Sequence, residues 1–337
     1  MTTNRTVRVR TGARLHFGPL SLRPESGRDF GGWGVMIDAP NCQVACRSAE
    51  HDAVIAAGDD QTRITKIRDE LRERFGVTQP LRIEVLEQIP PHRGLGSGTQ
   101  LVLAAATAMT QSLGHELPLH ALAEIGQRGR RSAVGIHGFA TGGLLVDAGH
   151  RSGEALGAIA CRLHFPEVWR FVLLRPLGVA GLAGAGERSA FAELPPMSES
   201  LTGRLCRLVL TEVLPAAQTA DYSGFAAALS EYSERIGEYF FPVQRGVFSW
   251  SVPERLLRFI STHRLGVAQS SWGPTLAVVC PSEAAAEEFR TTTRQGCAGE
   301  LPLEVDIVRP RNQPADCHCS PPDPFATPLL SETSHVK

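Results

Sequence analysis

The chain has almost no lysine. Lys66 and Lys337 are the only lysines among 34 basic residues in 337, so 32 are arginine. A phosphate-binding loop of the G-x-x-x-x-G-K-[ST] type is absent, and a bound phosphate must be held by arginine, backbone N–H groups or a metal. The formal net charge is −1, so the chain also lacks the excess positive charge that is typical of proteins binding nucleic acid or membrane surfaces.

Other absences narrow the class of protein. The eight cysteines form no C-x-x-C pair, and we expect reduced thiols in a cytoplasmic protein. Cys317, His318 and Cys319 are too close in sequence for a closed four-ligand metal site. No apolar run reaches the ~20 residues of a membrane span, and the first residues lack the apolar core of a signal peptide. No G-x-G-x-x-G follows the first expected strand, which disfavours a dinucleotide-binding fold.

The most informative segment that is present is PPHRGLGSGTQ, residues 90–100, which leads directly into the apolar run LVLAAATAMTQSL. Gly94, Gly96 and Gly98 permit tight turns and close approach of a ligand to the main chain. Either Thr99 or Ser97 is expected to cap a buried helix over 100–113. The free N–H groups at the start of that helix predict a phosphate or carboxylate site. The alternative is a glycine turn that only leads into a buried helix and binds nothing.

Periodicity predicts mixed α and β structure in two domains. The domains are expected over 5–160 and 161–310, with 311–337 a disordered tail. Strands are expected at 5–17, 33–48, 53–57, 81–90, 144–149, 170–178 and 303–310. Helices are expected at 61–75, 100–113, 118–130, 199–214, 221–237, 252–264 and 282–294. Residues 179–191 and 240–250 are expected to be loops.

Three glycine-bearing segments, TGARLHFG (11–18), PPHRGLGSGTQ (90–100) and GVAQSSWGPT (266–275), follow one another in an order that resembles the three motifs of the GHMP kinase superfamily. The resemblance implies an α+β fold of two domains. The N-terminal one is like domain 2 of ribosomal protein S5, with a βαβ crossover, and the C-terminal one is ferredoxin-like. The active site is expected in the cleft between the domains.

Further segments narrow the resemblance to one branch. RDFGGWGVMIDAP (28–40), VGIHGFATGGLLVD (134–147), GLAGAGERSAF (181–191) and FFPVQRGVFSW (240–250) look like β-ribofuranosylaminobenzene 5'-phosphate synthases over about residues 7–310. The family implies condensation of 4-aminobenzoate with phosphoribosyl pyrophosphate, with loss of carbon dioxide and pyrophosphate, at the entry to tetrahydromethanopterin biosynthesis. It also implies a homodimer with no nucleic-acid or membrane partner.

Two alternatives stay open at this point. One is an ATP-dependent small-molecule kinase of the same superfamily. Many such kinases have an Asp after the glycine-rich-loop helix, where this chain has Leu144, and Asp147 follows three residues later. The other is a catalytically silent sensor of nucleotides or sugar phosphates on the same fold.

The synthase reaction needs donors for the leaving pyrophosphate, a holder for the aromatic carboxylate and a site for the ring. The phosphate-binding candidates are His92, Arg93, Gly94, Gly96, Ser97, Gly98 and Thr99. The candidates for the catalytic centre are Arg14, His16, Arg28, Asp29 and His137. Glu187, Arg188, Gln244, Ser270, Ser271 and Trp272 are the remaining substrate-binding candidates. Mg²⁺ is expected because it commonly bridges a pyrophosphate, although no cluster of residues identifies its ligands.

One segment resembles a different ribose site. AVIAAGDDQTRIT (53–65) is faintly similar to the acidic loop of ordinary phosphoribosyltransferases, but an amphipathic helix is expected from Gln61. We therefore interpret Asp59 and Asp60 as an N-cap and turn pair.

Overall fold

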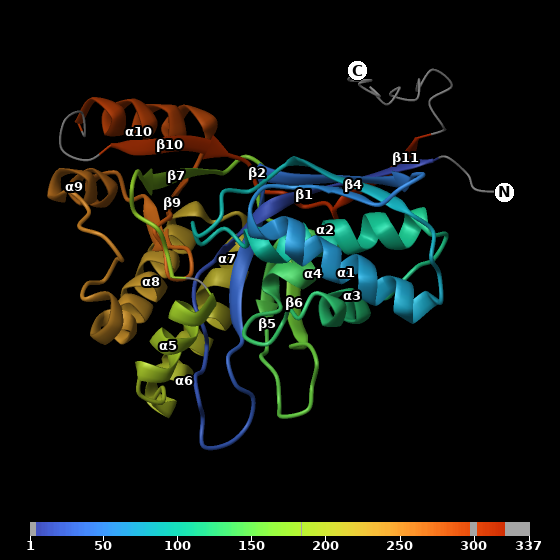
Figure 1. Cartoon of the computed structure of the whole chain (residues 1–337). Helices are drawn as coiled ribbons and strands as arrows, with labels where there is room; N and C mark the ends of the chain where they lie inside the picture. Colours follow the sequence, from blue (N-terminus) through green and yellow to red (C-terminus); the bar gives the residue numbers. More distant parts are fainter. Residues whose placement is uncertain (1–4, 183, 297–301, 321–337) are drawn as a thin grey trace.

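A computed structural model describes residues 5–182, 184–296 and 302–320. It contains two mixed layers of sheet and helix that meet in the middle of the molecule (Figure 1). None of the helices in the described residues is long and apolar enough to cross a membrane.

The N-terminal sheet is built around one long strand. β2 (Gly32–Ser48) pairs with β1 (Thr6–His16) on one side, and on the other with β5 (Leu144–Asp147) at its start and β4 (Leu81–Glu87) at its end. β3 (Ala53–Ile55) lies parallel to β4, with α1 (Asp59–Phe75) as the crossover. β6 (Ile159–Leu163) extends the sheet beyond β5.

A central helix fills the space beneath this sheet. α2 (Ser97–Ser112) is buried on nearly all sides, and its four fully buried alanines allow close packing against β1 and β2. Three helices lie around it: α1, α3 (Leu119–Ile125) and α4 (Val134–Thr141) (Figure 1). Burial of α2 fixes the place of its first turn, where the glycine-rich loop ends.

The C-terminal sheet has the strand order β10-β7-β9-β8, all antiparallel. Its strands are β7 (Arg170–Pro176), β8 (Gly266–Gln269), β9 (Leu276–Cys280) and β10 (Leu303–Val308). Alternate residues of β7 face opposite cores. Phe171 belongs to the same cluster as Phe225 of α8 (Tyr222–Gln244), and Val172 belongs to the cluster of α9 (Glu254–Thr262) and α10 (Glu283–Gly296). In chain order this is a 4-1-3-2 sheet, so the prediction of a ferredoxin-like second domain is confirmed.

Some helices of this domain differ in extent from those expected: α8 is longer, and α9 is shorter. They are α5 (Gly184–Glu193), α6 (Glu199–Leu208), the π-helical turn Val209–Val213, α7 (Leu214–Thr219), α8 (Tyr222–Gln244), α9 (Glu254–Thr262) and α10 (Glu283–Gly296). Two loop predictions are wrong. Residues 184–191 form most of α5, and α8 continues through Pro242 as far as Gln244.

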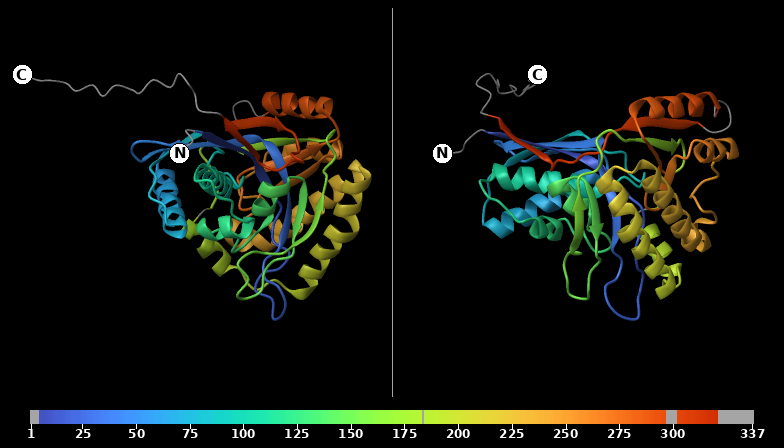
Figure 2. Two further views of the ribbon diagram at one scale, coloured as in Figure 1. Left: turned by 90° about the vertical axis from the view of Figure 1, so that its right-hand side faces the viewer. Right: turned by 180° about the vertical axis from the view of Figure 1, so that it is seen from behind.

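The chain returns to the N-terminal domain after β10. Asn312 forms two hydrogen bonds with the backbone of Phe165, and β11 (Asp316–Ser320) pairs antiparallel with β1. The prediction of a disordered tail is therefore wrong for 311–320, and 321–337 lie outside the described residues. The two turned views show this segment running along the N-terminal sheet (Figure 2).

Candidate active site

The glycine-rich loop joins the end of β4 to the start of α2. Gly94 and Gly96 have left-handed φ angles of 74° and 75°, which favour glycine. Gly96 is the N-cap of α2, so the prediction that Ser97 or Thr99 caps the helix is wrong. No described residue accepts a hydrogen bond from the N–H groups of Ser97 and Gly98. Both donors are available to an anion at the positive end of the helix dipole.

Both domains hold this loop in place. The carbonyl of Gly94 accepts hydrogen bonds from Ser270 Oγ at 2.6 Å and from Arg14 Nη1 at 3.0 Å. The carbonyl of Arg93 accepts one from Thr275 Oγ1 at 2.6 Å. A side chain at position 94 would collide with the carbonyl of Ser270. The loop therefore lies where β1 meets the third motif, between the two domains.

Arg14 and His16 stand on the same face of β1, at the end nearest the loop. Ser271 Oγ is 3.2 Å from Arg14 Nη1 and 3.5 Å from His16 Nδ1. Burial lowers the pKa of His16 well below 6.5, and the charge of Arg14 lowers it further, so the imidazole is neutral at pH 7. Burial also lowers the pKa of Arg14 to about 10, partly opposed by Glu187, so Arg14 keeps its charge.

The third motif supplies the opposite wall. Ser270 is fully buried, and its hydroxyl also accepts a hydrogen bond from the backbone N–H of His16 at 3.1 Å. Ser271 has a left-handed φ of 55°, a conformation that L side chains seldom adopt. The strained turn aims the Ser271 hydroxyl at Arg14, and such strain is common at functional sites.

An aromatic cluster continues from this turn. Trp272, only 3% exposed, stacks on Phe240 with ring centroids 4.1 Å apart, and Phe191 meets it edge-on at 5.2 Å. Phe30 packs edge-on against Phe191 at 5.7 Å. No described residue accepts a hydrogen bond from Trp272 Nε1. These rings form an apolar cluster that begins at the residue after Ser271.

Sequence analysis missed two arginines at the site. Arg128 lies against Gly98, since a Cβ atom built there would be 3.1 Å from Arg128 Nη2. Arg131 pairs with Glu187 at 2.9 Å, and its guanidinium lies 5.7 Å from the centre of the Phe191 ring. The run RGRR (128–131) lies about 30 residues after the glycine-rich loop, so the sequence alone did not indicate that these arginines lie close to it.

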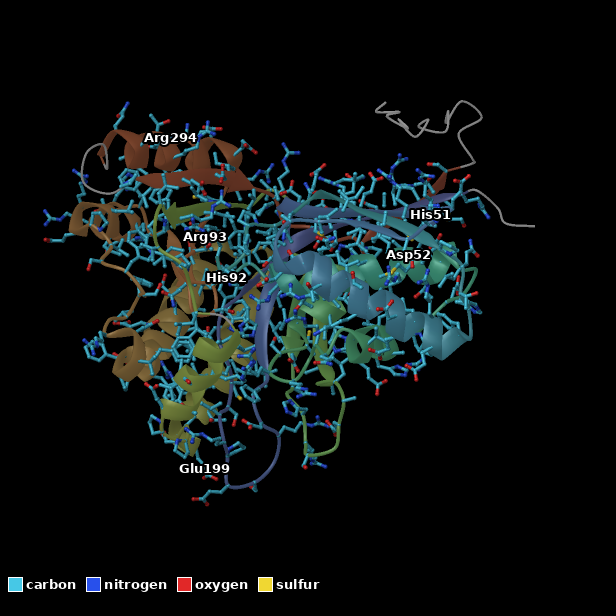
Figure 3. All side chains as sticks on the ribbon, viewed as in Figure 1. His51, Asp52, His92, Arg93, Glu199 and Arg294 are labelled. Atoms are coloured by element: carbon cyan, nitrogen blue, oxygen red, sulfur yellow. The ribbon has the colours of Figure 1, made fainter. Side chains whose placement is uncertain are left out.

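Two of the phosphate candidates point elsewhere. Arg93 donates to the carbonyls of Pro176 and Val179 at 2.7 and 2.8 Å, which ties the loop to the end of β7. His92 is exposed, and its carbonyl accepts a hydrogen bond from Gly181 at 2.7 Å. Figure 3 labels both residues where the two halves of the molecule meet.

Three catalytic candidates have structural partners: Arg28 and Asp29 lie in a loop, and His137 lies in α4. Arg28 pairs with Glu154 at 2.6 Å, and the bond joins two projecting loops. The carboxylate of Asp29 accepts hydrogen bonds from the N–H groups of residues 23 and 30, which closes its own turn. His137 Nε2 lies 2.8 Å from the carbonyl of Gly157. None of these contacts reaches the glycine-rich loop.

The remaining candidates lie on α5 and α8. Arg188 is exposed on α5, one residue after Glu187. Gln244, the last residue of α8, donates to the carbonyls of Gly246 and Val247 and accepts a hydrogen bond from Gln269. A cavity of about 440 Å³ opens beside it, lined by residues 244–252 and Leu257, none of which belongs to the glycine-rich loop.

Asp147 has a structural role. It is 1% exposed at the end of β5, and it accepts hydrogen bonds from the N–H groups of Ala133 at 2.5 Å and Gly149 at 2.8 Å. Burial raises its pKa above the usual value. One oxygen holds the start of α4 and the other holds the turn after β5, so this carboxylate is not a free base.

The residues around the loop suit an anion better than a bare metal ion. Within the described ranges, no three His, Cys, Asp or Glu side chains gather closely enough to hold a metal. Cys317 of β11 donates a hydrogen bond to Gln111 at 2.8 Å instead. Glu187, a carboxylate that interacts with Arg14 and Arg128, is already paired with Arg131.

Solved structures with this fold are GHMP proteins. A homoserine kinase from Cytophaga hutchinsonii matches with a TM-score of 0.62 and 17% identity, over 94% of this chain and 98% of that one. A mevalonate diphosphate decarboxylase from Staphylococcus aureus matches with a TM-score of 0.67 and 13% identity, over 93% and 98%. At these identities the likeness shows the fold, which confirms the predicted two-domain α+β architecture.

Sequence comparisons identify the branch. The family model described as the GHMP kinases N terminal domain matches residues 62–143, from α1 to the turn after α4. A protein of Archaeoglobus fulgidus named beta-ribofuranosylphenol 5'-phosphate synthase is 30% identical over 68% of this chain and 75% of its own length. The protein of the same name from Methanothermobacter thermautotrophicus is 28% identical over 80% of this chain and 87% of its own. The chain therefore belongs to the family of beta-ribofuranosylphenol 5'-phosphate synthases, enzymes on the GHMP kinase fold.

Proposed function

We propose that the chain is a transferase of methanopterin biosynthesis that condenses 4-aminobenzoate with phosphoribosyl pyrophosphate. Carbon dioxide and pyrophosphate leave, and 4-(β-D-ribofuranosyl)aminobenzene 5'-phosphate forms. Family membership supports the class of reaction. The observation that carries the proposal is the junction at Ser271: its hydroxyl contacts Arg14 at the phosphate loop, and the next residue, Trp272, begins the aromatic cluster.

The proposed reaction needs hydrogen-bond donors placed where the pyrophosphate leaves. The bond from ribose C1 to pyrophosphate breaks, and negative charge grows on the leaving oxygens. Free N–H groups of Ser97 and Gly98, with the guanidinium of Arg14, are fixed donors for that charge. The ring carbon bearing the carboxylate then bonds to C1, and loss of carbon dioxide returns its electron pair to the ring.

No step in this scheme requires a protein base. Neutral His16 is suited to hold Ser271 or a substrate group by a hydrogen bond and adds no further charge beside Arg14. The aromatic cluster excludes water from the ring and orients its face toward C1. Mg²⁺ would be carried on the pyrophosphate, whose charge it neutralises, with few ligands from the protein.

The names of the relatives favour a second aromatic acid. A ribofuranosylphenol product corresponds to 4-hydroxybenzoate, in which a hydroxyl replaces the para amine. Both groups donate electrons to the ring and both acids have the same outline. The two acids would therefore undergo the same reaction, and they differ only in the para group that the site accepts.

One labelling experiment tests the proposal. The protein is incubated with carboxyl-labelled 4-aminobenzoate or 4-hydroxybenzoate, phosphoribosyl pyrophosphate and Mg²⁺, and released carbon dioxide is trapped. We expect label release only with the phosphoribosyl donor, equal to the pyrophosphate formed, and none from benzoate, which has no para donor. Release without the donor would mean a simple decarboxylase and would refute the mechanism.

The same preparation separates the alternatives. A kinase would bind Mg-ATP in calorimetry and release no label, and a sensor would bind a ligand without turnover. Two observations argue against the kinase: Leu144 stands where many of these kinases have an Asp, and both oxygens of the nearby Asp147 are engaged.

A further inference from the structure

Arg128 is a cation without a counter-ion. It follows α3, and its guanidinium lies over Gly98 in the first turn of α2. No described acid forms an ion pair with it, and its Nε is buried without a hydrogen-bond partner. Burial lowers its pKa, which reports that the charge is partly removed from water. A largely buried arginine normally has a negatively charged partner, so the lack of one here points to a bound anion as its partner.

Arg131 has a partner, but one from the other domain. Its guanidinium meets Glu187 of α5, and both side chains keep partial exposure, 35% and 24%. The pair thus joins a residue of the N-terminal domain to α5 of the C-terminal domain. A partly exposed pair of this kind contributes little to stability, so a stronger anion can replace the carboxylate.

The local balance of charge is positive. Arg14, Arg128 and Arg131 interact electrostatically with one another or with the same acid, Glu187. Asp60 also acts on Arg128, but Asp60 is already paired with Arg63 at 2.6 Å. Three arginines therefore share one carboxylate next to two unused N–H donors.

We propose that Arg128 and Arg131 form, with Arg14 and the start of α2, a subsite for a diphosphate group, and that Glu187 occupies Arg131 until the diphosphate displaces it. This rests on the proposed function, because it assigns the pyrophosphate end of the phosphoribosyl donor to this place. Each arginine can donate two parallel hydrogen bonds to phosphate oxygens, which a lysine cannot do. This chain has only two lysines, so arginine is the side chain expected to bind a diphosphate.

The test uses inorganic pyrophosphate as the probe, titrated calorimetrically into the full chain with and without Mg²⁺ at fixed ionic strength. Arg128→Gln should weaken binding ~10-fold or more, as loss of a charged hydrogen-bond partner does. Glu187→Gln should tighten binding roughly 2- to 5-fold, because it removes the competing carboxylate. Arg130→Gln, an exposed neighbour in the same turn, is the matched control and should bind as the wild type does.

A structural role would give a different pattern. Since Arg128 has no ion pair to lose, Arg128→Gln should keep the Tm of the unliganded protein and reduce only the rise in Tm on adding pyrophosphate. A lower Tm without ligand, unchanged binding in Arg128→Gln, or weaker binding in Glu187→Gln would each overturn the subsite. If the binding results hold but no labelled carbon dioxide appears, the proposed function fails and the diphosphate subsite stands.

Discussion

The side chain of Arg14 lies directly against Gly96. A Cβ atom built on Gly96 would come within 2.8 Å of Arg14 Cγ and 3.3 Å of Arg14 Nε, and the φ of Gly96 is left-handed. The glycine therefore does two things: it turns the chain into α2 and leaves room for the cation beneath the loop.

Gly96→Ala should therefore displace Arg14 and disturb the free N–H donors. We expect a loss of ~10²-fold or more in kcat/KM, as removal of preorganised donors typically gives, and a bulkier residue at Ser97 should do the same. The assay is label release, with circular dichroism as the check that the variant is folded. A folded variant with full activity would show that the anion site lies elsewhere.

Arg14→Ala should impair turnover while the protein stays folded. The variant loses the hydrogen bonds to the Gly94 carbonyl and the Ser271 hydroxyl along with the positive charge. Arg14→Lys retains the positive charge but loses the planar group that can donate two parallel hydrogen bonds, so it should recover only part of the activity. Steady-state kinetics of both variants against phosphoribosyl pyrophosphate measure this. Equal activity of Arg14→Ala and wild type would remove Arg14 from the mechanism.

His16 should make the protein less stable in mild acid. Its pKa is well below 6.5 in the folded state because of burial and Arg14, whereas the unfolded chain takes up the proton near 6.5. Stability is therefore unaffected by this group above pH ~6.5 and falls as the pH drops below it, by up to about 1.4 kcal/mol per pH unit. The loss continues until the pH reaches the folded-state pKa.

Urea denaturation between pH ~7 and ~5 measures that slope. His16→Gln should lose less stability over this range than the wild type does. His51→Gln is the control: His51 is exposed and lies in the N-terminal half, away from the junction of the two halves (Figure 3), and should follow the wild type. Parallel curves for all three proteins would contradict the neutral buried state of His16.

Asp59→Ala should leave turnover within about 2-fold of the wild type, because surface changes of this kind are usually near neutral. Asp59 is exposed in the first turn of α1, whose N-cap is Gly58, so the expected N-cap and turn pair is instead a pair within the first helical turn. The label-release assay decides this. A loss of ~10-fold or more would assign ribose binding to this turn.

The sequence predicted those parts of the fold whose signal is local. Alternation marked β1 and β4, and glycines followed by an apolar run marked the loop and α2. It missed α5, because GAGERSAF contains residues that favour turns, and its helical state depends on Phe191 packing among other rings. It ended α8 too early, because Pro242 discourages a helix, yet the last turn is held by packing of Phe240 on Trp272.

The candidate site divides in the same way. Arg14, Ser270 and Ser271 meet because each lies in a motif with its own glycine signal. Arg128 and Arg131 reach the loop only through the packing of α3 and α4 around α2, which no pattern in one sequence reveals. The residue types of Arg28 and Asp29 favoured a place in the site, but Arg28 pairs with a neighbouring loop and the carboxylate of Asp29 closes its own.

The pairing of β11 with β1 sets the order in which the protein can be completed during synthesis. Residues 316–320 cover the outer edge of β1 at residues 6–10, the first strand made. A ribosome must therefore translate the whole C-terminal domain before the N-terminal sheet gains its last strand. Until then the N–H and C=O groups along that edge are open to another nascent chain, which makes the emerging N-terminal half the stage most exposed to aggregation.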